Sequence, residues 1–134
     1  MKVKRNVLIV IDGSGETAKM AAEIVTALKG NNVEVKTAFE FEGNDILPAQ
    51  AFFLGCEKPK PDSFAYLTEL LKHINLAGRP CGVFSPGSEK AAKYLAALVR
   101  DSGAALSPEL FFAVSGDVKT WAQNIVSNLL QQRR

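Results

Sequence analysis

The residues best suited to bind an anion lie near the amino end of the chain, in the turn Asp12-Gly13-Ser14-Gly15-Glu16-Thr17. This turn follows a continuous apolar run over residues 7–11, typical of a strand covered on both faces, and precedes a helical pattern over residues 18–29. Free backbone N–H groups and the helix dipole meet at the start of such a helix, and two hydroxyls add donors. The sequence therefore predicts a site for a phosphate-bearing ligand, which the carboxylates of Asp12 and Glu16 oppose.

The same turn also has a purely structural interpretation. Gly13 and Gly15 suit any tight turn between a strand and a helix, whatever that turn binds. Asp12 can cap the helix by accepting backbone N–H groups, or its carboxylate can fill the phosphate position with the protein's own anion. The direction in which Asp12 points decides between these interpretations.

The elements that must position this turn alternate between strand and helix. Further strands are predicted at residues 33–41 (an edge strand ending near Thr37), 51–55, 80–84 and 109–114, and residues 42–50 are too short for a helix of ordinary length. Further helices are predicted at residues 89–102 and 118–130, and between Ser63, which caps its helix, and Gly78, which ends it. The central strands lack polar alternation, which indicates a doubly wound α/β fold with a parallel sheet.

Ligands of such sheets lie beyond the carboxyl ends of the strands, at the point where the strand order reverses. In this chain the strand ends are Asp12, Gly55 with Cys56, Ser85 and Ser115. Each of them opens into a turn of small or polar residues. We therefore expect a crevice where these turns meet.

The segments around these strand ends resemble the flavodoxin family. The apolar strand Leu8-Ile9-Val10 is followed, at the spacing of that family's phosphate loop, by Gly15, Thr17, Ala21 and Ile24. The segments Phe52-Phe53-Leu54-Gly55-Cys56 and Gly82-Val83-Phe84-Ser85-Pro86-Gly87 are similar to those that lead into the second and third flavin loops. The similarity in order and length covers nearly the whole chain.

The resemblance implies a three-layer fold whose five parallel strands follow the order 2-1-3-4-5, with FMN at the switch point between strands 1 and 3. FMN would then contact the turn over residues 12–17, a second loop with Gly55, Cys56 and Glu57, and a third loop with Ser85, Pro86, Gly87 and Ser88. The implied function is electron transfer with a redox partner protein, and the flavin would supply the chemistry.

Three departures from the family predict a weakened flavin affinity. Asp12 replaces the first hydroxyl of the phosphate turn, residues 57–62 contain no aromatic side chain, and Tyr94 falls on the inward stripe of its helix. These departures leave a second function open, namely a flavodoxin-like domain without flavin that acts through protein contacts or another small ligand. Phosphoacceptor receiver domains share the strand order. They need an aspartate after strand 3 and a lysine after strand 5, where this chain has Gly55-Cys56 and Val114-Ser115.

Bulk composition narrows the remaining classes. The 134 residues fit one domain over residues 1–134, and the net charge is only +2. No apolar run approaches the roughly 20 residues of a membrane span, and no basic helix face is interleaved with aromatics. We therefore expect a cytoplasmic protein with no membrane and no nucleic-acid partner, and the oligomeric state stays open.

Few other residues suggest chemistry. Cys56 and Cys81 are predicted at opposite edges of the sheet, too far apart for a disulfide, and Cys56 is predicted to be a small apolar filler rather than a reactive thiol. His73 has no second ligand spaced for a metal site, and Trp121 lies on an apolar stripe that indicates core packing. No catalytic triad or paired-carboxylate site can be assembled. We expect an electron carrier or binding domain rather than an enzyme with its own catalytic residues.

Overall fold

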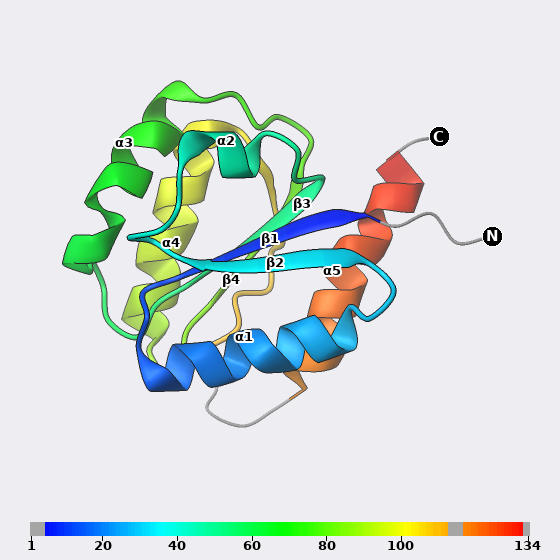
Figure 1. Ribbon diagram of the computed structural model, residues 1–134, viewed down its shortest axis with the longest axis horizontal. Helices are drawn as coiled ribbons and strands as arrows, with labels where there is room; N and C mark the ends of the chain where they lie inside the picture. Colours follow the sequence, from blue (N-terminus) through cyan, green and yellow to red (C-terminus); the bar gives the residue numbers. More distant parts are fainter. Residues whose placement is uncertain (1–4, 113–116, 133–134) are drawn as a thin grey trace.

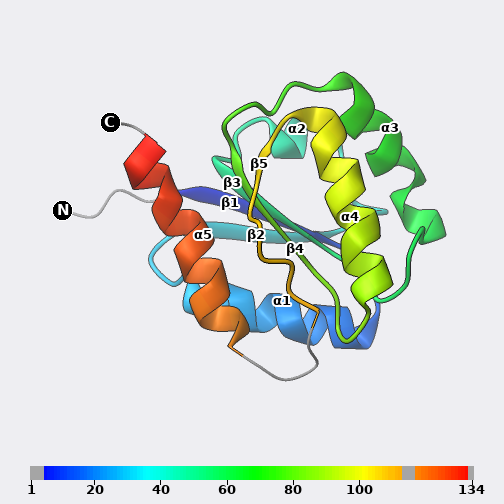
Figure 2. The same cartoon turned by 180° about the vertical axis from the view of Figure 1, so that it is seen from behind.

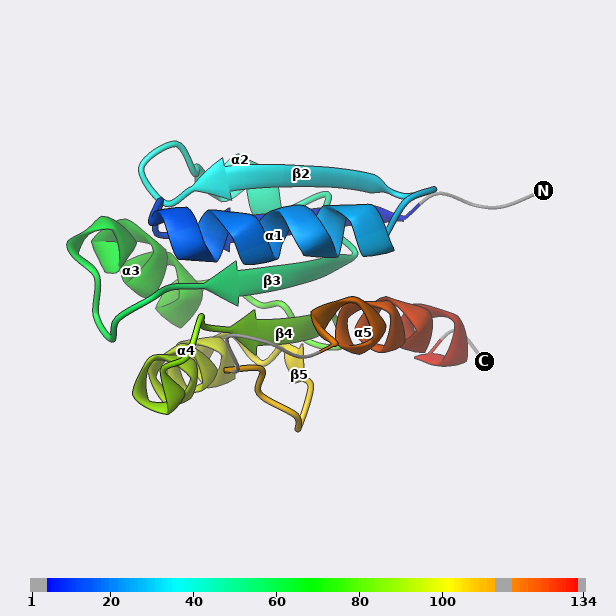
Figure 3. The ribbon, with the colours of Figure 1, turned by 90° about the horizontal axis from the view of Figure 1, so that it is seen from below.

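The computed structural model describes residues 5–112 and 117–132. Its five strands form one parallel sheet in the order β2-β1-β3-β4-β5, which confirms the predicted topology. The strands are β1 (Asn6–Ile11), β2 (Asn32–Thr37), β3 (Ala51–Gly55), β4 (Pro80–Phe84) and β5 (Ala105–Leu106). Figure 3 shows the arrowheads of β2, β3 and β4 pointing the same way, so their carboxyl ends meet at one edge of the sheet.

Helices form a layer on each face of the sheet. They are α1 (Gly15–Ala27), α2 (Gly43–Ile46), α3 (Ala65–His73), α4 (Glu89–Ser102) and α5 (Val118–Gln132), with a 3-10 turn, η1 (Asp62–Phe64), before α3. Figures 1 and 2 show α1 and α5 on one side of the sheet and α3 and α4 on the other. The result is the three-layer α/β fold that the sequence predicts.

The central strand β1 shows why the apolar run over residues 7–11 has no polar alternation. Val7 and Ile9 pack against α1 and α5, whereas Leu8 and Val10 pack against the layer that contains α2, α3 and α4. Successive side chains of a strand point to opposite faces, so a strand with helices on both faces must be apolar at every position. β3 and β4 are buried in the same way along their whole length.

The edge strand β2 ends at Thr37, as predicted, and its side chains are half-buried or exposed. The segment that follows contains only the single helical turn α2. The guanidinium of Arg79 holds this turn by donating to the carbonyl oxygens of Ile46 and Ala49, at 2.8 and 2.9 Å. The segment beside the edge strand is therefore a short helical turn rather than a full helix, and the ion pair between Lys36 and Asp45 joins it to β2 at 3.3 Å.

The predicted bounds of β3, β4 and α4 are confirmed, whereas those of α3 are wrong at both ends. Ser63 does not cap α3, because residues 62–64 form the 3-10 turn and α3 begins at Ala65. At the other end, Ile74 is extended, and the side chain of Asn75 accepts a hydrogen bond from the N–H of Ala77. This side-chain turn competes with the helix, so α3 ends at His73 and not near Gly78.

The fifth strand also differs from its predicted position at residues 109–114. Pairing with β4 begins earlier, at Ala105 and Leu106, and resumes in a single bridge between Phe111 and Phe84. Pro108 lies between the two paired stretches, and its lack of an N–H group explains the interruption. Residues 113 and 114 of the predicted strand lie outside the described residues.

Candidate functional site

The register of the sheet brings three of the predicted loops together. Ile11 pairs with Gly55, and Gly55 pairs with Phe84, so Asp12, Cys56 and Ser85 each follow directly at the same edge. The N–H of Cys56 donates to the carbonyl oxygen of Phe84 at 3.3 Å, which continues the ladder beyond the strand ends. The turn over residues 12–17, the loop over residues 55–57 and the loop over residues 85–88 therefore lie side by side. Ser115, the fourth predicted strand end, lies outside the described residues.

The turn after β1 leads directly into α1, which starts at Gly15, three residues earlier than predicted. Ser14 is the N-cap, and its hydroxyl oxygen accepts the N–H of Thr17 at 3.3 Å. The hydroxyls of Ser14 and Thr17 also lie 2.7 Å apart. The N–H groups of Gly15 and Glu16 have no hydrogen-bond partner within the described part of the chain and stand at the positive end of the helix dipole.

Asp12 points into this cluster of loops and joins two of them. One carboxylate oxygen accepts the N–H of Ser14 at 3.0 Å, and the other accepts the N–H of Glu57 at 2.8 Å. The first bond is the local turn that the sequence suggests, although Ser14 rather than Asp12 caps the helix. The second bond connects residues 45 positions apart in the chain. Asp12 is therefore a carboxylate bridge between the first and second loops.

The two glycines of the turn have different roles. Gly13 has a φ of +92°, a left-handed backbone conformation that residues other than glycine adopt only at a cost in free energy. Gly15 has no such φ, and a Cβ added at this position would meet no atom within 4 Å. Neither backbone conformation nor packing requires glycine at residue 15. The backbone at residue 15 is therefore open to an approaching group, as an anion site at a helix N-terminus requires.

The third loop contains a buried hydroxyl with an unused hydrogen-bonding capacity. The side chain of Ser85 is 0% exposed, and its oxygen has no hydrogen-bond partner among the described residues. The other side-chain hydroxyl of this loop is committed, because Ser88 caps α4 by accepting the N–H of Ala91 at 3.1 Å. Gly87 adopts a φ of +97°, which the turn between them requires. Buried polar groups are nearly always paired, so Ser85 stands out as a group that a ligand could satisfy.

Cys56 occupies the buried side of the second loop. Its side chain is fully buried, and burial together with the negative charge of Asp12 raises the pKa of the Cys56 thiol to about 12. Complete burial fits the predicted small apolar filler, and a raised pKa favours the neutral thiol over the nucleophilic thiolate. Cys81 is also free and buried, and burial raises its pKa well above the usual value.

The second loop is polar and lies at the surface of the protein. Residues 57–61 are half-buried or exposed and include no aromatic side chain. Lys60 adopts a left-handed backbone with a φ of +53°, the one positive φ outside glycine in the described ranges. Strain of this kind gathers at ligand-binding loops, and here it lies three residues beyond the Asp12 bridge.

Sequence reasoning missed an aromatic cavity beside these loops. Its volume is about 650 Å³, and it is lined by residues from the segment after β2 and from the start of α3, including Phe39, Phe41 and Tyr66. Phe39 is 83% exposed, although the alternation of residues 33–41 puts it on the same side as Val33 and Val35. The predicted end of β2 at Thr37 was the sequence signal for this exposure, because the alternation of a strand does not apply to residues beyond its end.

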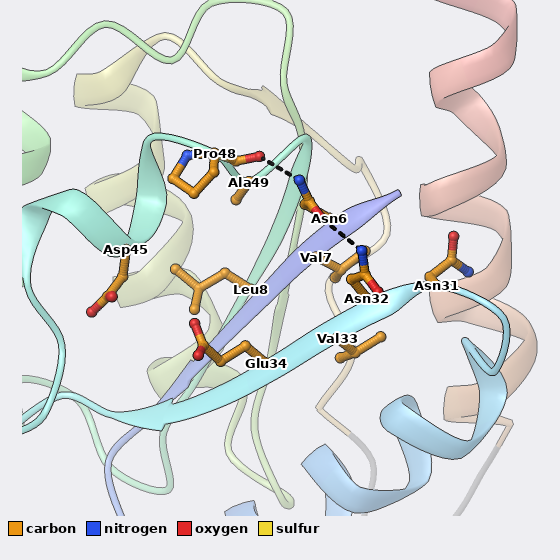
Figure 4. Close-up of a pocket in the computed structure, with 10 residues that line it drawn as sticks. All are labelled: Asn6, Val7, Leu8, Asn31, Asn32, Val33, Glu34, Asp45, Pro48 and Ala49. Carbon is orange, nitrogen blue, oxygen red and sulfur yellow. Dashed lines mark hydrogen bonds between the residues drawn. The ribbon is translucent and has the colours of Figure 1, made fainter. Parts of the chain in front are cut away.

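A second groove lies at the amino ends of β1 and β2, beyond the opposite end of β1 from the three loops (Figure 4). Its volume is about 540 Å³, and the short α2 leaves it uncovered. The amide nitrogen of Asn32 donates to Asn6 at 3.1 Å, and that of Asn6 donates to the carbonyl oxygen of Pro48 at 3.4 Å. These amides satisfy one another, so the groove's polar lining is explained by the fold.

Other functional classes find no support in the described ranges. His73 is exposed at the end of α3, and no group of three or more His, Cys, Asp or Glu residues in residues 5–112 and 117–132 is arranged to hold a metal ion. Across those same residues, no helix has the length and apolar character needed to cross a membrane. Trp121 packs in the core against Phe53, Phe84 and Phe111, as its place on the apolar stripe of α5 predicts.

Comparisons with solved structures agree with this architecture. The chain is similar to a flavodoxin of Streptococcus pneumoniae, with a TM-score of 0.79 and 19% identity over 92% of this chain and 98% of that one. It is also similar to oxidised flavodoxin 2 of Bacillus cereus, with a TM-score of 0.74 and 19% identity over 96% and 99% of the two chains. A Fusobacterium nucleatum flavodoxin variant bound to flavin mononucleotide gives a TM-score of 0.71 and 12% identity over 96% of each chain.

No protein-family model matches the chain, and a search of curated proteins finds no match. The likeness to the solved structures therefore concerns the fold, which is flavodoxin-like.

Proposed function

We propose that this chain is an electron carrier that binds FMN, with weakened affinity, at the carboxyl edge of its sheet. The observation that carries the proposal is the convergence of three loops in a flavodoxin-like fold, with Gly15 open to an approaching ligand and the Ser85 hydroxyl without a partner. The flavin would supply one- and two-electron redox chemistry, and a redox partner protein would deliver or accept the electrons.

Different residues would hold the two halves of FMN. The N–H groups of Gly15 and Glu16 and the hydroxyl of Ser14 face the place of a phosphate at the start of α1. The loops with Ser85 and with Cys56 and Glu57 would meet the flavin ring, and binding would have to expose the Ser85 hydroxyl, which is fully buried in the free protein. These groups suit FMN only in part, because Asp12 adds a negative charge beside the phosphate.

The weakened affinity follows from what the second and third loops lack. Residues 57–61 offer no ring to stack on the flavin, and Tyr94 is half-buried on α4 beside the core. An aromatic contact contributes about 0.5–1.5 kcal/mol beyond area burial, so losing two of them weakens binding on the order of ten- to a hundredfold. A dissociation constant in the micromolar range is the expectation.

The test is a titration of FMN fluorescence with purified protein. Quenching that saturates at micromolar protein, together with reversible reduction of the bound flavin, is the expected result. The Gly15→Ala variant tests the location of the phosphate. Its added methyl meets no atom of the free protein, so it should weaken FMN binding without changing the fold. An unchanged fluorescence at hundreds of micromolar protein would rule the proposal out.

A second candidate function is a flavin-free module that binds a protein or another small ligand. The observation in its favour is the aromatic cavity, where Phe39 and Tyr66 expose apolar surface beside a loop that lacks the family's stacking residue. Exposed aromatic side chains in a concave surface are typical of binding sites. Asp12→Thr combined with an aromatic residue in the loop over residues 57–62 should then create FMN affinity that the natural chain lacks.

A further inference from the structure

The Asp12 bridge occupies part of the place where a flavin phosphate would be recognised. Its two carboxylate oxygens hold the N–H groups of Ser14 and Glu57, at 3.0 and 2.8 Å. One of these donors belongs to the turn before α1, so an incoming phosphate finds it already used. The bridge is half-buried, where solvent screens its charge less than at an exposed position.

The negative charge of a phosphate makes the position of the Asp12 carboxylate important for binding. A phosphate monoester carries about −1.5 to −2 charges near neutral pH. A carboxylate within about 4 Å of it repels it strongly at the dielectric of a protein surface, whereas the uncharged ribityl and ring portions of a flavin feel no such repulsion. The Asp12 carboxylate therefore weakens the binding of FMN and not that of riboflavin.

Glu16 provides an internal comparison within the same turn. Glu16 is the second residue of α1 and carries the same charge as Asp12. Its side chain is exposed and lies 3.5 Å from the ammonium of Lys19. It accepts no backbone N–H of the turn in the described structure. Its charge is therefore screened by water and by Lys19, and it can turn away from a ligand.

We propose that Asp12 removes the site's preference for the phosphate, so that riboflavin binds at least as tightly as FMN. This inference rests on the proposed function for its flavin ligand, and it assigns to Asp12 the role of a specificity-determining residue. The ligand class is an isoalloxazine with an uncharged side chain. While the carboxylate remains, its repulsion of the phosphate offsets the attraction of the phosphate to the N–H groups at the start of α1.

The experiment compares the dissociation constants of FMN and riboflavin for the natural protein, Asp12→Asn, Asp12→Thr and Glu16→Gln. Asp12→Asn removes the charge at nearly constant shape, and Asp12→Thr places a hydroxyl there. We expect both to tighten FMN binding by about tenfold or more and to leave riboflavin within about twofold, while Glu16→Gln changes neither beyond about twofold. Melting temperatures confirm that the variants fold.

Three results would overturn the inference: a tenfold preference of the natural protein for FMN, equal tightening of both flavins in Asp12→Asn, or an equal effect of Glu16→Gln. A separate arm uses inorganic phosphate and the amide resonances of residues 13–17. Phosphate should shift them in Asp12→Asn and not in the natural protein; no shift in Asp12→Asn overturns the inference. If no variant binds either flavin, the proposed function fails, and this arm alone decides the role of Asp12.

Discussion

Alanine substitutions at Gly55 and Gly15 should have opposite consequences, because the two glycines serve different purposes. A Cβ at Gly55 would lie 2.3 Å from the ring of Phe84, a distance that real Cβ contacts do not show. That ring is fully buried and packs edge-on against Trp121, with the ring centroids 6.4 Å apart, so it has no free space to move into. Gly55→Ala therefore overpacks the core at the edge of the candidate site.

The expected magnitude can be worked from these contacts. Overpacking costs about 1–3 kcal/mol, and alanine recovers about 0.5–1 kcal/mol relative to glycine in a strand. A 2.3 Å approach corresponds to the upper part of the overpacking range, about 2–3 kcal/mol, so the net loss is about 1–2.5 kcal/mol, which for a chain of this length lowers the melting temperature by about 3–9 °C. Gly15→Ala makes no contact within 4 Å and should leave the melting temperature unchanged or slightly raised.

Thermal unfolding followed by circular dichroism measures both effects, and FMN titration completes the comparison. Gly15→Ala should keep the fold and weaken FMN binding by about tenfold, since its methyl would stand where the phosphate approaches. Adding Phe84→Leu to Gly55→Ala should relieve the clash, so the double variant loses less stability than the two single losses together. Additive losses within about 0.5 kcal/mol would refute the clash, and a stable Gly15→Ala with unchanged FMN affinity would refute the ligand role.

Three further predictions concern the core, the thiol and the exposed aromatic. Gly82→Ala should destabilise the protein by about 1–3 kcal/mol in denaturant unfolding, because its Cβ would lie 2.5 Å from Ile125 and 2.9 Å from Trp121; a neutral effect would contradict this packing. Cys56 should react with iodoacetamide at pH 8 about a thousandfold more slowly than an exposed cysteine, because a raised pKa favours the unreactive neutral thiol, and its rate should rise as pH approaches 12. Ordinary reactivity at pH 8 would show that the thiol is not buried. Phe39→Ser should change the free energy of unfolding by less than about 0.5 kcal/mol, since the ring is 83% exposed; a larger loss would mean that this ring packs in the core.

The sequence predicts most of the fold because the central strands are covered on both faces. A strand between two helix layers must be continuously apolar, and β3 and β4 follow that pattern to the residue. α4 is equally clear, since Ser88 caps its first turn and Gly103 ends it with a φ of +78°. These signals are local, because each depends on residues within or next to its own element.

The errors arise where a local signal competes with another. Asn75 turns the chain after His73 although apolar residues continue the helical pattern, and Pro108 interrupts the ladder between β5 and Phe111. The bridge from Asp12 to Glu57 could not be predicted, because it depends on the register that sets β1 beside β3. The convergence of the three loops was predictable from topology, whereas the direction of each side chain within them was not.

We propose that a flavin binds where the turn after β1 meets the loops after β3 and β4. Amide resonances followed during an FMN titration test this location residue by residue. We expect shifts in residues 13–17, 55–58 and 85–88, with the resonances of the groove around Asn6 and Asn32 unchanged. Shifts confined to that groove or to the cavity around Phe39, or none at all with FMN in excess, would contradict it.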